Sequence, residues 1–247
     1  MILTEAEAAR RIYCAIDTPD AARAEALARG LAGAGCGIKL GLEFFSAQGP
    51  DGVARVQAAT PGTDLFLDLK FHDIPNTVAA AVKAACRLGP RILNVHASGG
   101  RAMMAAAADA ARDGAAAAGK TAPLVIAVTV LTSLETADIE AMGVIGGVEE
   151  QVVRLATLAR EAGLDGIVCS AREIAPIRRA LGDDFILVTP GIRPAGSDAG
   201  DQKRVMTPPE AISGGANYLV IGRPITGAPD PAAAARAIAA SIAAARG

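Results

Sequence analysis

Eight short apolar segments recur along this chain, separated by longer stretches that are mostly rich in alanine. Most of these segments are apolar almost without interruption, instead of alternating between apolar and polar residues. Such runs are typical of parallel strands that are buried on both faces, because helices cover the sheet from both sides. We therefore predict eight strands, at residues 11–17, 37–41, 64–70, 92–97, 124–130, 166–170, 185–190 and 218–223.

The intervening stretches carry the signals of helices. Two of them consist largely of alanine, the strongest helix former. Others begin near a proline or end before a glycine, which are common boundary residues of helices. These patterns predict helices over residues 19–31, 75–88, 100–118, 149–162 and 231–246. The helices after the second, sixth and seventh strands are expected to be shorter or harder to bound.

Eight strand-then-helix units within 247 residues predict an α/β fold, a single (β/α)8 TIM barrel. A doubly wound open sheet is the rival architecture. Its dinucleotide-binding signature, Gly-x-Gly-x-x-Gly, does not follow the first strand, which continues as AIDTPDAA. No linker or shift in composition divides the chain, so we expect one catalytic domain over residues 1–247.

Composition excludes several classes of protein. Hydrophobic residues make up 51% of the chain and charged residues 20%, which excludes intrinsic disorder. The formal net charge of −2 and the aromatic content of 3% argue against nucleic-acid binding. The longest strongly apolar run, residues 123–131, is too short to span a bilayer, and the acidic N-terminal segment does not resemble a signal peptide. We expect a cytoplasmic protein that binds neither nucleic acid nor membrane.

The cysteines and histidines are few and scattered, so we expect no metal site. His72 and His96 are expected to pack and form hydrogen bonds near one end of the barrel, without a catalytic role. The cysteines form no Cys-x-x-Cys pair and are expected to fill space in the core: Cys14, Cys36, Cys86 and Cys169.

Charged residues gather where the first three strands end, which is the face of such barrels that carries the active site. They are Asp17, Lys39, Asp68, Lys70 and Asp73. Because Asp68 and Lys70 are two residues apart on a strand, they are expected to share one face. A structural ion-pair cluster is one interpretation, although buried ion pairs contribute little to stability. The alternative is a lysine kept protonated by carboxylates, which makes a proton donor rather than an amine nucleophile.

A phosphate site is expected beside this cluster. The loop after the seventh strand, residues 191–207, is long and rich in glycine, serine and aspartate, as a mobile lid would be. The eighth strand ends in Gly222 and Arg223, and phosphate sites of these barrels commonly lie between these two loops. Glycine allows a phosphate to approach the backbone, and arginine can bind it through two hydrogen bonds. The alternative for Arg223 is an ordinary surface residue of a helix.

The segment FLDLKFHDIPNTV, residues 66–78, resembles the orotidine 5'-phosphate decarboxylase family. The family pattern Asp-x-Lys-x-x-Asp, followed by Ile-Pro-x-Thr, is matched by Asp68, Lys70, Asp73, Ile74 and Thr77. Related sugar-phosphate lyases share the first part of this pattern, whereas the second part is not typical of them. Further matches follow in order along nearly the whole chain, most similar to the bacterial form, at Asp17, Lys39, Thr132, Arg193, Gln202 and Arg223.

This resemblance implies decarboxylation of orotidine 5'-phosphate to UMP, in de novo pyrimidine synthesis, without a cofactor or metal. Loss of CO2 from C6 leaves a carbanion that the ring delocalises poorly. The resemblance implies that Lys70 stabilises this carbanion and then protonates it. Asp68 would face the substrate carboxylate and disfavour it in the ground state. Lys39 and Asp73 would hold the charged groups in place.

The resemblance also implies how the substrate is held. Lys39 and Asp17 would contact ribose hydroxyls, and Thr132 would lie near the pyrimidine. The phosphate would be bound by Arg193, Gln202, Gly222 and Arg223. Members of the family are homodimers, in which the equivalents of three residues enter the neighbouring subunit's site; here these are Asp73, Ile74 and Thr77.

Two competing functions remain open at this point. A related sugar-phosphate lyase, such as a keto-sugar-phosphate decarboxylase or a hexulose-phosphate synthase, would need Mg²⁺ and a different acidic residue at the second strand. A non-catalytic phosphate-binding barrel would need the charged cluster to be broken, and in this sequence it is whole.

Overall fold

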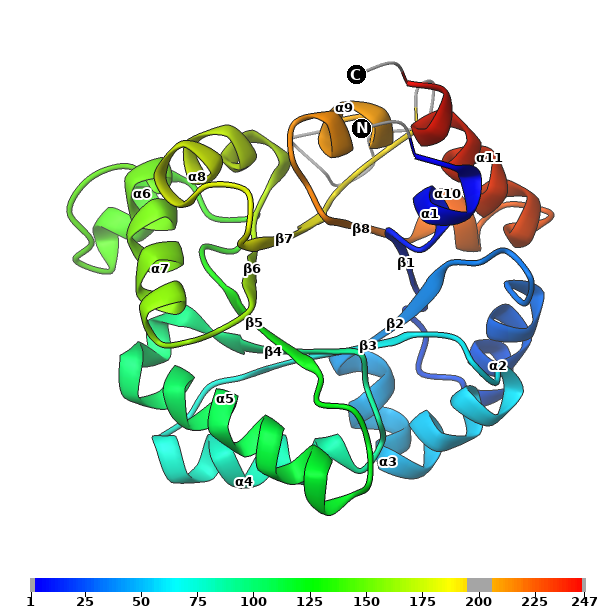
Figure 1. Cartoon of the computed structure of the whole chain (residues 1–247), viewed down its shortest axis with the longest axis horizontal. Helices are drawn as coiled ribbons and strands as arrows, with labels where there is room; N and C mark the ends of the chain where they lie inside the picture. The colour runs from blue at the N-terminus through cyan, green and yellow to red at the C-terminus, as the bar shows by residue number, and fades with distance from the viewer. Residues whose placement is uncertain (1–2, 195–205, 246–247) are drawn as a thin grey trace.

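The computed structural model describes residues 3–194 and 206–245, and eight parallel strands close into a barrel in chain order. Figure 1 looks down this barrel and shows the helices as a ring around it. The predicted (β/α)8 fold is confirmed, and the open doubly wound sheet is excluded because β1 pairs with both β2 and β8. The strands are β1 Ile12–Ala15, β2 Gly37–Gly41, β3 Leu65–Phe71, β4 Ile92–His96, β5 Leu124–Val128, β6 Gly166–Val168, β7 Ile186–Pro190 and β8 Tyr218–Ile221.

All five predicted helices are present, with ends close to those expected. The α-helices are α1 Glu5–Ala9, α2 Ala21–Gly30, α3 Leu42–Ala59, α4 Pro75–Cys86, α5 Gly100–Ala117, α6 Thr136–Ala141, α7 Val148–Glu161, α8 Ile174–Leu181, α9 Pro208–Ser213, α10 Arg223–Thr226 and α11 Pro231–Ala244. Two short 3₁₀ turns, η1 Ala97–Gly99 and η2 Ala171–Glu173, follow β4 and β6.

Helix α3, after the second strand, was expected to be shorter or harder to bound; it is not short, because it runs for 18 residues, but its helix pattern is interrupted. Gly49 inside it has φ 61°, and Pro50 follows, so the helix is broken into two parts at this point. Proline removes a helical hydrogen bond, which explains both the kink and the obscured helix pattern in the sequence. The helices α8 and α9, after the sixth and seventh strands, are short as expected.

Five strands, β1, β4, β5, β6 and β8, end one or two residues earlier than predicted, and the ends of β1 and β8 bear on the site. β1 ends at Ala15, so Asp17 lies in the loop beyond it. β8 ends at Ile221, and Arg223 begins α10 instead of closing the strand. The reason is Pro224, whose fixed φ and missing N–H suit the first turn of a helix and not a central strand. Both residues nevertheless stay at the rim where the strands end.

Apolar side chains fill the barrel from the inside as well as covering it from outside. Tyr13 and Phe66 point inward with ring centroids 6.0 Å apart, and Tyr218 lies 5.6 Å from Tyr13. The other buried members of this inner cluster are Ala15, Ile92, Ile126, Val188 and Val220. This packing fills the interior of the barrel below the carboxyl ends of the strands.

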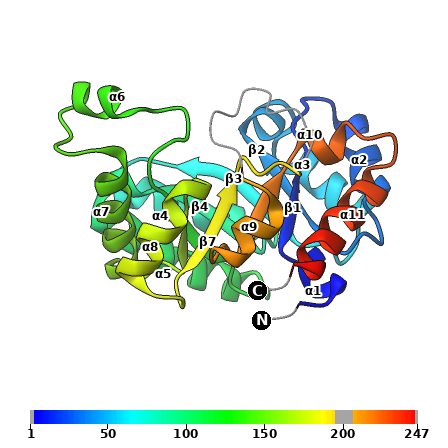
Figure 2. The same ribbon diagram turned by 90° about the horizontal axis from the view of Figure 1, so that it is seen from above.

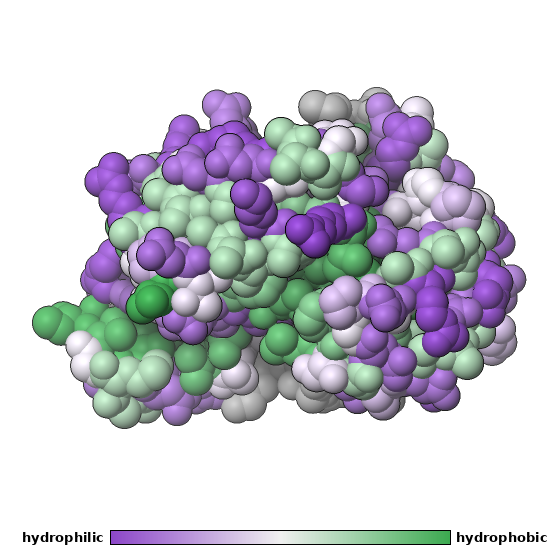
Figure 3. Space-filling model, turned by 90° about the horizontal axis from the view of Figure 1, so that it is seen from below, coloured by the Kyte–Doolittle hydropathy of each residue, from purple (hydrophilic) through white to green (hydrophobic). Residues whose placement is uncertain are grey.

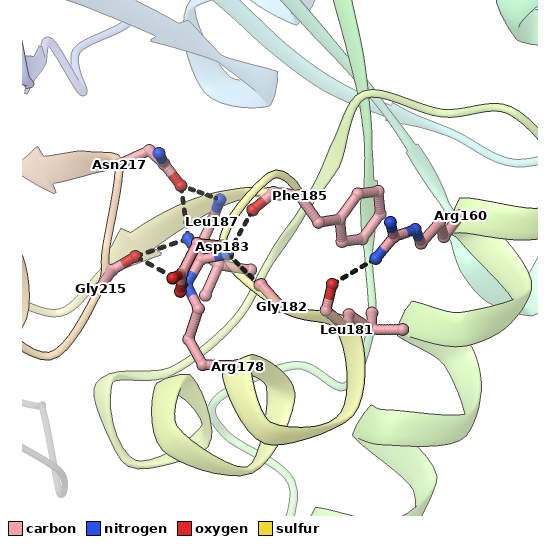
Figure 4. A network of polar contacts seen from close by, with 9 residues as sticks. All are labelled: Arg160, Arg178, Leu181, Gly182, Asp183, Phe185, Leu187, Gly215 and Asn217. Carbon is pink, nitrogen blue, oxygen red and sulfur yellow. Dashed lines mark hydrogen bonds and ion pairs between the residues drawn. The ribbon is translucent and has the colours of Figure 1, made fainter.

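Arg178 of α8 ties together the loops at the opposite, amino-terminal end of the barrel, as Figure 4 shows. Its guanidinium donates hydrogen bonds to the carbonyl oxygens of Gly182, Phe185 and Gly215 over 2.6–3.1 Å. It also donates to Oδ1 of Asn217 at 2.7 Å. Arg178 therefore has a structural role, unlike the arginines at the carboxyl ends of the strands.

The segment that carries α6 projects from the barrel on the same side as the strand ends (Figure 2). Met142 and Ile145 in this segment are 64% and 87% exposed. In Figure 3 the projection is apolar at its tip, and apolar surface continues along the edge beside it. Within the two described ranges, no helix is long and apolar enough to cross a membrane.

Candidate active site

A cavity of about 520 Å³ opens at the carboxyl ends of the strands. Its wall contains predicted site residues that come from six different strands or the loops behind them: Asp17, Lys39, Asp68, Lys70, Thr132, Arg193, Gly222 and Arg223. Asp73, Ile74 and Thr77 are not part of this wall. Gln202 lies outside the described residues.

Four of these side chains form a line of alternating charge across the first three strands. Lys39 Nζ lies 3.1 Å from Asp17 Oδ1 and 3.4 Å from Asp68 Oδ2. Lys70 Nζ lies 2.6 Å from Asp68 Oδ1. Strand pairing brings them together, because Gly41 of β2 is the partner of Asp68 in β3. The ammonium of Lys70 ends the line and faces the cavity.

Asp68 carries a full negative charge in this line although it is only 9% exposed. Burial by itself would raise its pKa, but the charges of Lys39 and Lys70 and the hydrogen bonds from Lys70 and Asn94 outweigh burial. The net result is an Asp68 pKa below its ordinary value. An ionised carboxylate thus contacts both lysines at neutral pH.

The expected contact between Asp68 and Lys70 is present, but a regular strand does not produce it. The pairing of β3 with β4 shifts register between Leu67 and Phe71. Within that interval Lys70 has φ 50°, the only positive φ of a non-glycine residue in residues 3–194 and 206–245. A left-handed backbone is costly for lysine and is commonly kept where function needs it. The two-residue spacing of Asp68 and Lys70 therefore does not by itself explain their contact, which also involves the irregular backbone at Lys70.

Asn94 is the site residue that the sequence analysis did not assign. It is 1% exposed in β4, lines the cavity, and donates from Nδ2 to Asp68 Oδ1 at 2.7 Å. Its Oδ1 accepts from the backbone N–H of Lys70 at 2.8 Å. The available signal was a lone amide with apolar neighbours on both sides in the strand ILNVH.

Two arginines face the cavity from the last two strand ends. Arg193, just after β7, is 6% exposed, and Arg223 begins α10. Burial lowers the pKa of Arg193, and the positive charge of Arg223 lowers it further, so the two guanidinium groups are close enough to repel each other. The backbone N–H of Arg193 donates to the carbonyl of Met206 at 3.1 Å. This hydrogen bond connects the described residues before position 195 with those after position 205. A bound dianion would relieve the repulsion between these arginines.

Asp73 does not join the line of charges within its own chain. It is exposed, and its Oδ1 accepts a hydrogen bond from the N–H of Ile74 at 2.6 Å. The ion pairs among the described residues do not include it. The expected cluster of three carboxylates therefore contains two in a single chain. Ile74, 66% exposed, and Thr77 also face solvent here.

The histidines and cysteines are placed outside the line of charges. The rings of His72 and His96 lie 5.5 Å apart, and burial, followed by the charges of His72 and Lys70, lowers the pKa of His96. All four cysteines are buried and free, as expected for core residues. Cys169 borders the cavity, but burial raises its pKa to about 12, so it is a neutral thiol. No three His, Cys, Asp or Glu side chains in the described part of the chain could hold a metal ion together.

A model of the family described as "Orotidine 5'-phosphate decarboxylase / HUMPS family" matches residues 10–238. This chain belongs to that family. The protein named orotidine 5'-phosphate decarboxylase in Moorella thermoacetica is 59% identical over 233 residues, which cover 94% of this chain and 92% of that protein. The protein of the same name in Rhodospirillum rubrum is 59% identical over 231 residues, covering 94% and 93%.

Solved structures show the same relationship. The orotidine 5'-phosphate decarboxylase of Lactobacillus acidophilus has a TM-score of 0.82 and 36% identity, and the match covers 94% of this chain and 99% of that one. A structure titled as an uncharacterized conserved protein from Geobacillus kaustophilus has a TM-score of 0.82 and 38% identity, with the same coverage. The family resemblance drawn from the sequence motifs is therefore confirmed.

Proposed function

We propose that this protein decarboxylates orotidine 5'-phosphate to UMP and CO2 in de novo pyrimidine synthesis. Its family and its relatives of that name support the reaction. The observation in the site that carries the proposal is the ammonium of Lys70, held 2.6 Å from Asp68 and facing a cavity with two arginines opposite. A volume of about 520 Å³ is within the range of small-molecule sites and suits a nucleotide.

The charges of the cavity give the substrate one orientation. The phosphate binds Arg193 and Arg223, next to the backbone of Gly222, with Gln202 completing the site. The ribose hydroxyls face Asp17 and Lys39. The pyrimidine then extends toward Thr132 on one side, with its C6 carboxylate directed at Asp68 and Lys70.

The chemistry uses Lys70 as both an electrostatic group and an acid. The bond between C6 and the carboxylate carbon breaks, CO2 leaves, and the electron pair stays on C6. The nearby ammonium stabilises this developing charge and then donates its proton to C6, which completes UMP. Lys70 regains a proton from solvent. Asp68 keeps the ammonium charged and repels the substrate carboxylate, while Lys39 holds Asp68 in place. No cofactor or metal takes part in this scheme.

We also propose a homodimer in which Asp73, Ile74 and Thr77 of each chain complete the partner's site. These residues follow the strand that carries Lys70 within a few positions, yet they are exposed and do not line the cavity of their own chain. Exposed apolar side chains occur on the same rim, which supports burial against a second copy: Leu42, Ile74, Leu131, Met142 and Ile145. A single domain over residues 1–247 and a cytoplasmic location remain predictions.

The deciding experiment follows the loss of orotate-ring absorbance when the purified protein is mixed with orotidine 5'-phosphate, with and without EDTA. We expect conversion to UMP at the same rate in both arms. Absence of turnover of orotidine 5'-phosphate, together with Mg²⁺-dependent turnover of a keto-sugar phosphate that EDTA abolishes, would favour a sugar-phosphate lyase of the keto-sugar-phosphate decarboxylase or hexulose-phosphate synthase type. Binding of UMP without any turnover would favour a non-catalytic phosphate-binding barrel.

A further inference from the structure

The strand that carries Lys70 is bulged, and a single residue of the neighbouring strand lies opposite the bulge. Leu67 pairs with Leu93 and Phe71 pairs with Val95. Three residues of β3 therefore lie between these pairs, whereas β4 contributes only Asn94. Such a bulge interrupts the ladder of backbone hydrogen bonds and redirects the side chains on the bulged strand.

Asn94 replaces the missing ladder contact with its side chain. Its Oδ1 accepts from the backbone N–H of Lys70 at 2.8 Å, at the residue with φ 50°. Its Nδ2 donates 2.7 Å to Oδ1 of Asp68, the same oxygen that contacts Lys70 Nζ. The buried amide of Asn94 thus acts on Lys70 at two places. It binds the backbone N–H of Lys70 directly, and it binds the Asp68 oxygen that contacts the Lys70 ammonium.

We propose that Asn94 is a positioning residue for decarboxylation, because it holds the bulge that directs the ammonium of Lys70 into the cavity. Aspartate could accept from the Lys70 N–H but, when ionised, could not donate to Asp68. Leucine could do neither while filling a similar volume. Asparagine is the side chain of this size that supplies one acceptor and one donor. This role rests on the proposed function, since Lys70 is the proton donor there.

The chain offers a matched control in Asn217, seen in Figure 4. Its Oδ1 also accepts a backbone N–H from a neighbouring strand, that of Leu187 at 2.8 Å, and it contacts a charged side chain, Arg178. Asn217 is not part of the wall of the cavity. Replacing Asn217 measures the cost of losing such a bridge where no reacting group depends on it.

The experiment compares Asn94→Leu, Asn94→Asp and Asn217→Leu with the unmodified protein. We expect Asn94→Leu to lower kcat by about 10- to 100-fold, as for loss of a hydrogen bond to a charged group, with UMP affinity changed less than about 3-fold. In Asn94→Asp the introduced carboxyl lies against Asp68, so its pKa is raised and its protonated form can again donate. The kcat of Asn94→Asp relative to the unmodified protein should therefore rise as pH falls from about 8 to about 5.5.

Crystal structures without substrate provide a readout that does not depend on activity. In Asn94→Leu we expect Lys70 to leave the left-handed region and its ammonium to separate from Asp68. An unchanged Lys70 together with an unchanged kcat would overturn the proposal. So would equal losses of kcat and UMP affinity that match those of Asn217→Leu. If the unmodified protein did not turn over orotidine 5'-phosphate but Lys70 still moved in Asn94→Leu, the positioning of Lys70 would stand and only the proposed reaction would fail.

Discussion

Replacing Lys39 by methionine tests whether the line of charges is a working unit. Lys39 lies between two carboxylates, at 3.1 Å from Asp17 and 3.4 Å from Asp68, and its side chain is 10% exposed. Removing one partner from a buried ion pair costs about 3–5 kcal/mol. Because Lys70 still contacts Asp68, we expect a smaller loss of about 2–3 kcal/mol. For a chain of this length that corresponds to a melting temperature lower by roughly 4–12 °C.

The same substitution has a pH signature whose sign follows from Asp68. Its folded-state pKa is below the ordinary value, so it stabilises the fold above the unfolded value and loses that contribution as pH falls through the folded value. Without Lys39, the effect of burial on Asp68 is opposed less, so the folded-state pKa of Asp68 rises. As pH is lowered, Lys39→Met should therefore lose both stability and kcat at a higher pH than the unmodified protein does.

The assays are thermal melts and steady-state rates between about pH 4 and 8, the range in which a shifted carboxyl titrates. Lys83→Met, at an exposed position of α4, is the matched control and should change neither. Lys39→Met could instead have the same melting temperature as Lys83→Met and the same loss of kcat at low pH as the unmodified protein. In that case Lys39 would not be the charge partner of Asp68, and the line of alternating charge would have no functional role.

Two further predictions concern the ends of the cavity. Lys70→Ala should fold and bind UMP but turn over substrate at less than about a hundredth of the normal rate, because one ammonium both stabilises the carbanion and protonates it; steady-state rates and UMP titration check this. Arg223→Ala should lower kcat/KM for orotidine 5'-phosphate by about 10²-fold while hardly changing the rate with the nucleoside orotidine, since the lost contact is to phosphate; equal fractional losses would contradict a phosphate role.

The barrel could be predicted from the sequence because its signals are local and repeated. Each buried strand shows as an apolar run, and alanine, proline and glycine bound the helices on either side of it. The prediction was weakest where a local signal misleads. Gly49 and Pro50 interrupt α3 without ending it, and Pro224 makes a helix of residues that read as the end of a strand.

The site could be predicted in composition but not in conformation. The charged residues at the strand ends are visible in the sequence, and a barrel brings strand ends together. The left-handed backbone of Lys70 depends instead on pairing with a strand 24 residues away, through Asn94. Nothing near Lys70 in the sequence encodes that contact. Side chains that act on another residue's backbone are therefore the part of a site that motif reading misses most easily.

Two charged residues near the end of β3 lie in different surroundings. Lys70 faces its own cavity, while Asp73, only three residues later, is exposed and bonded to its own Ile74 N–H. In the proposed homodimer these two residues belong to different sites. Two-fold symmetry then makes a definite demand, because each site takes Lys70 from one chain and Asp73 from the other.

Mixed dimers of Lys70→Ala and Asp73→Ala test that demand. Each variant alone should be nearly inactive. In a mixed dimer one site collects both lesions and the other collects neither. Equal mixing makes about half of the dimers mixed, so roughly a quarter of the normal activity should return. If Asp73 served its own chain, every site would carry one lesion and nothing would return. Mass-tagged chains verify exchange, and no recovery after proven exchange would leave Asp73 outside the partner's site.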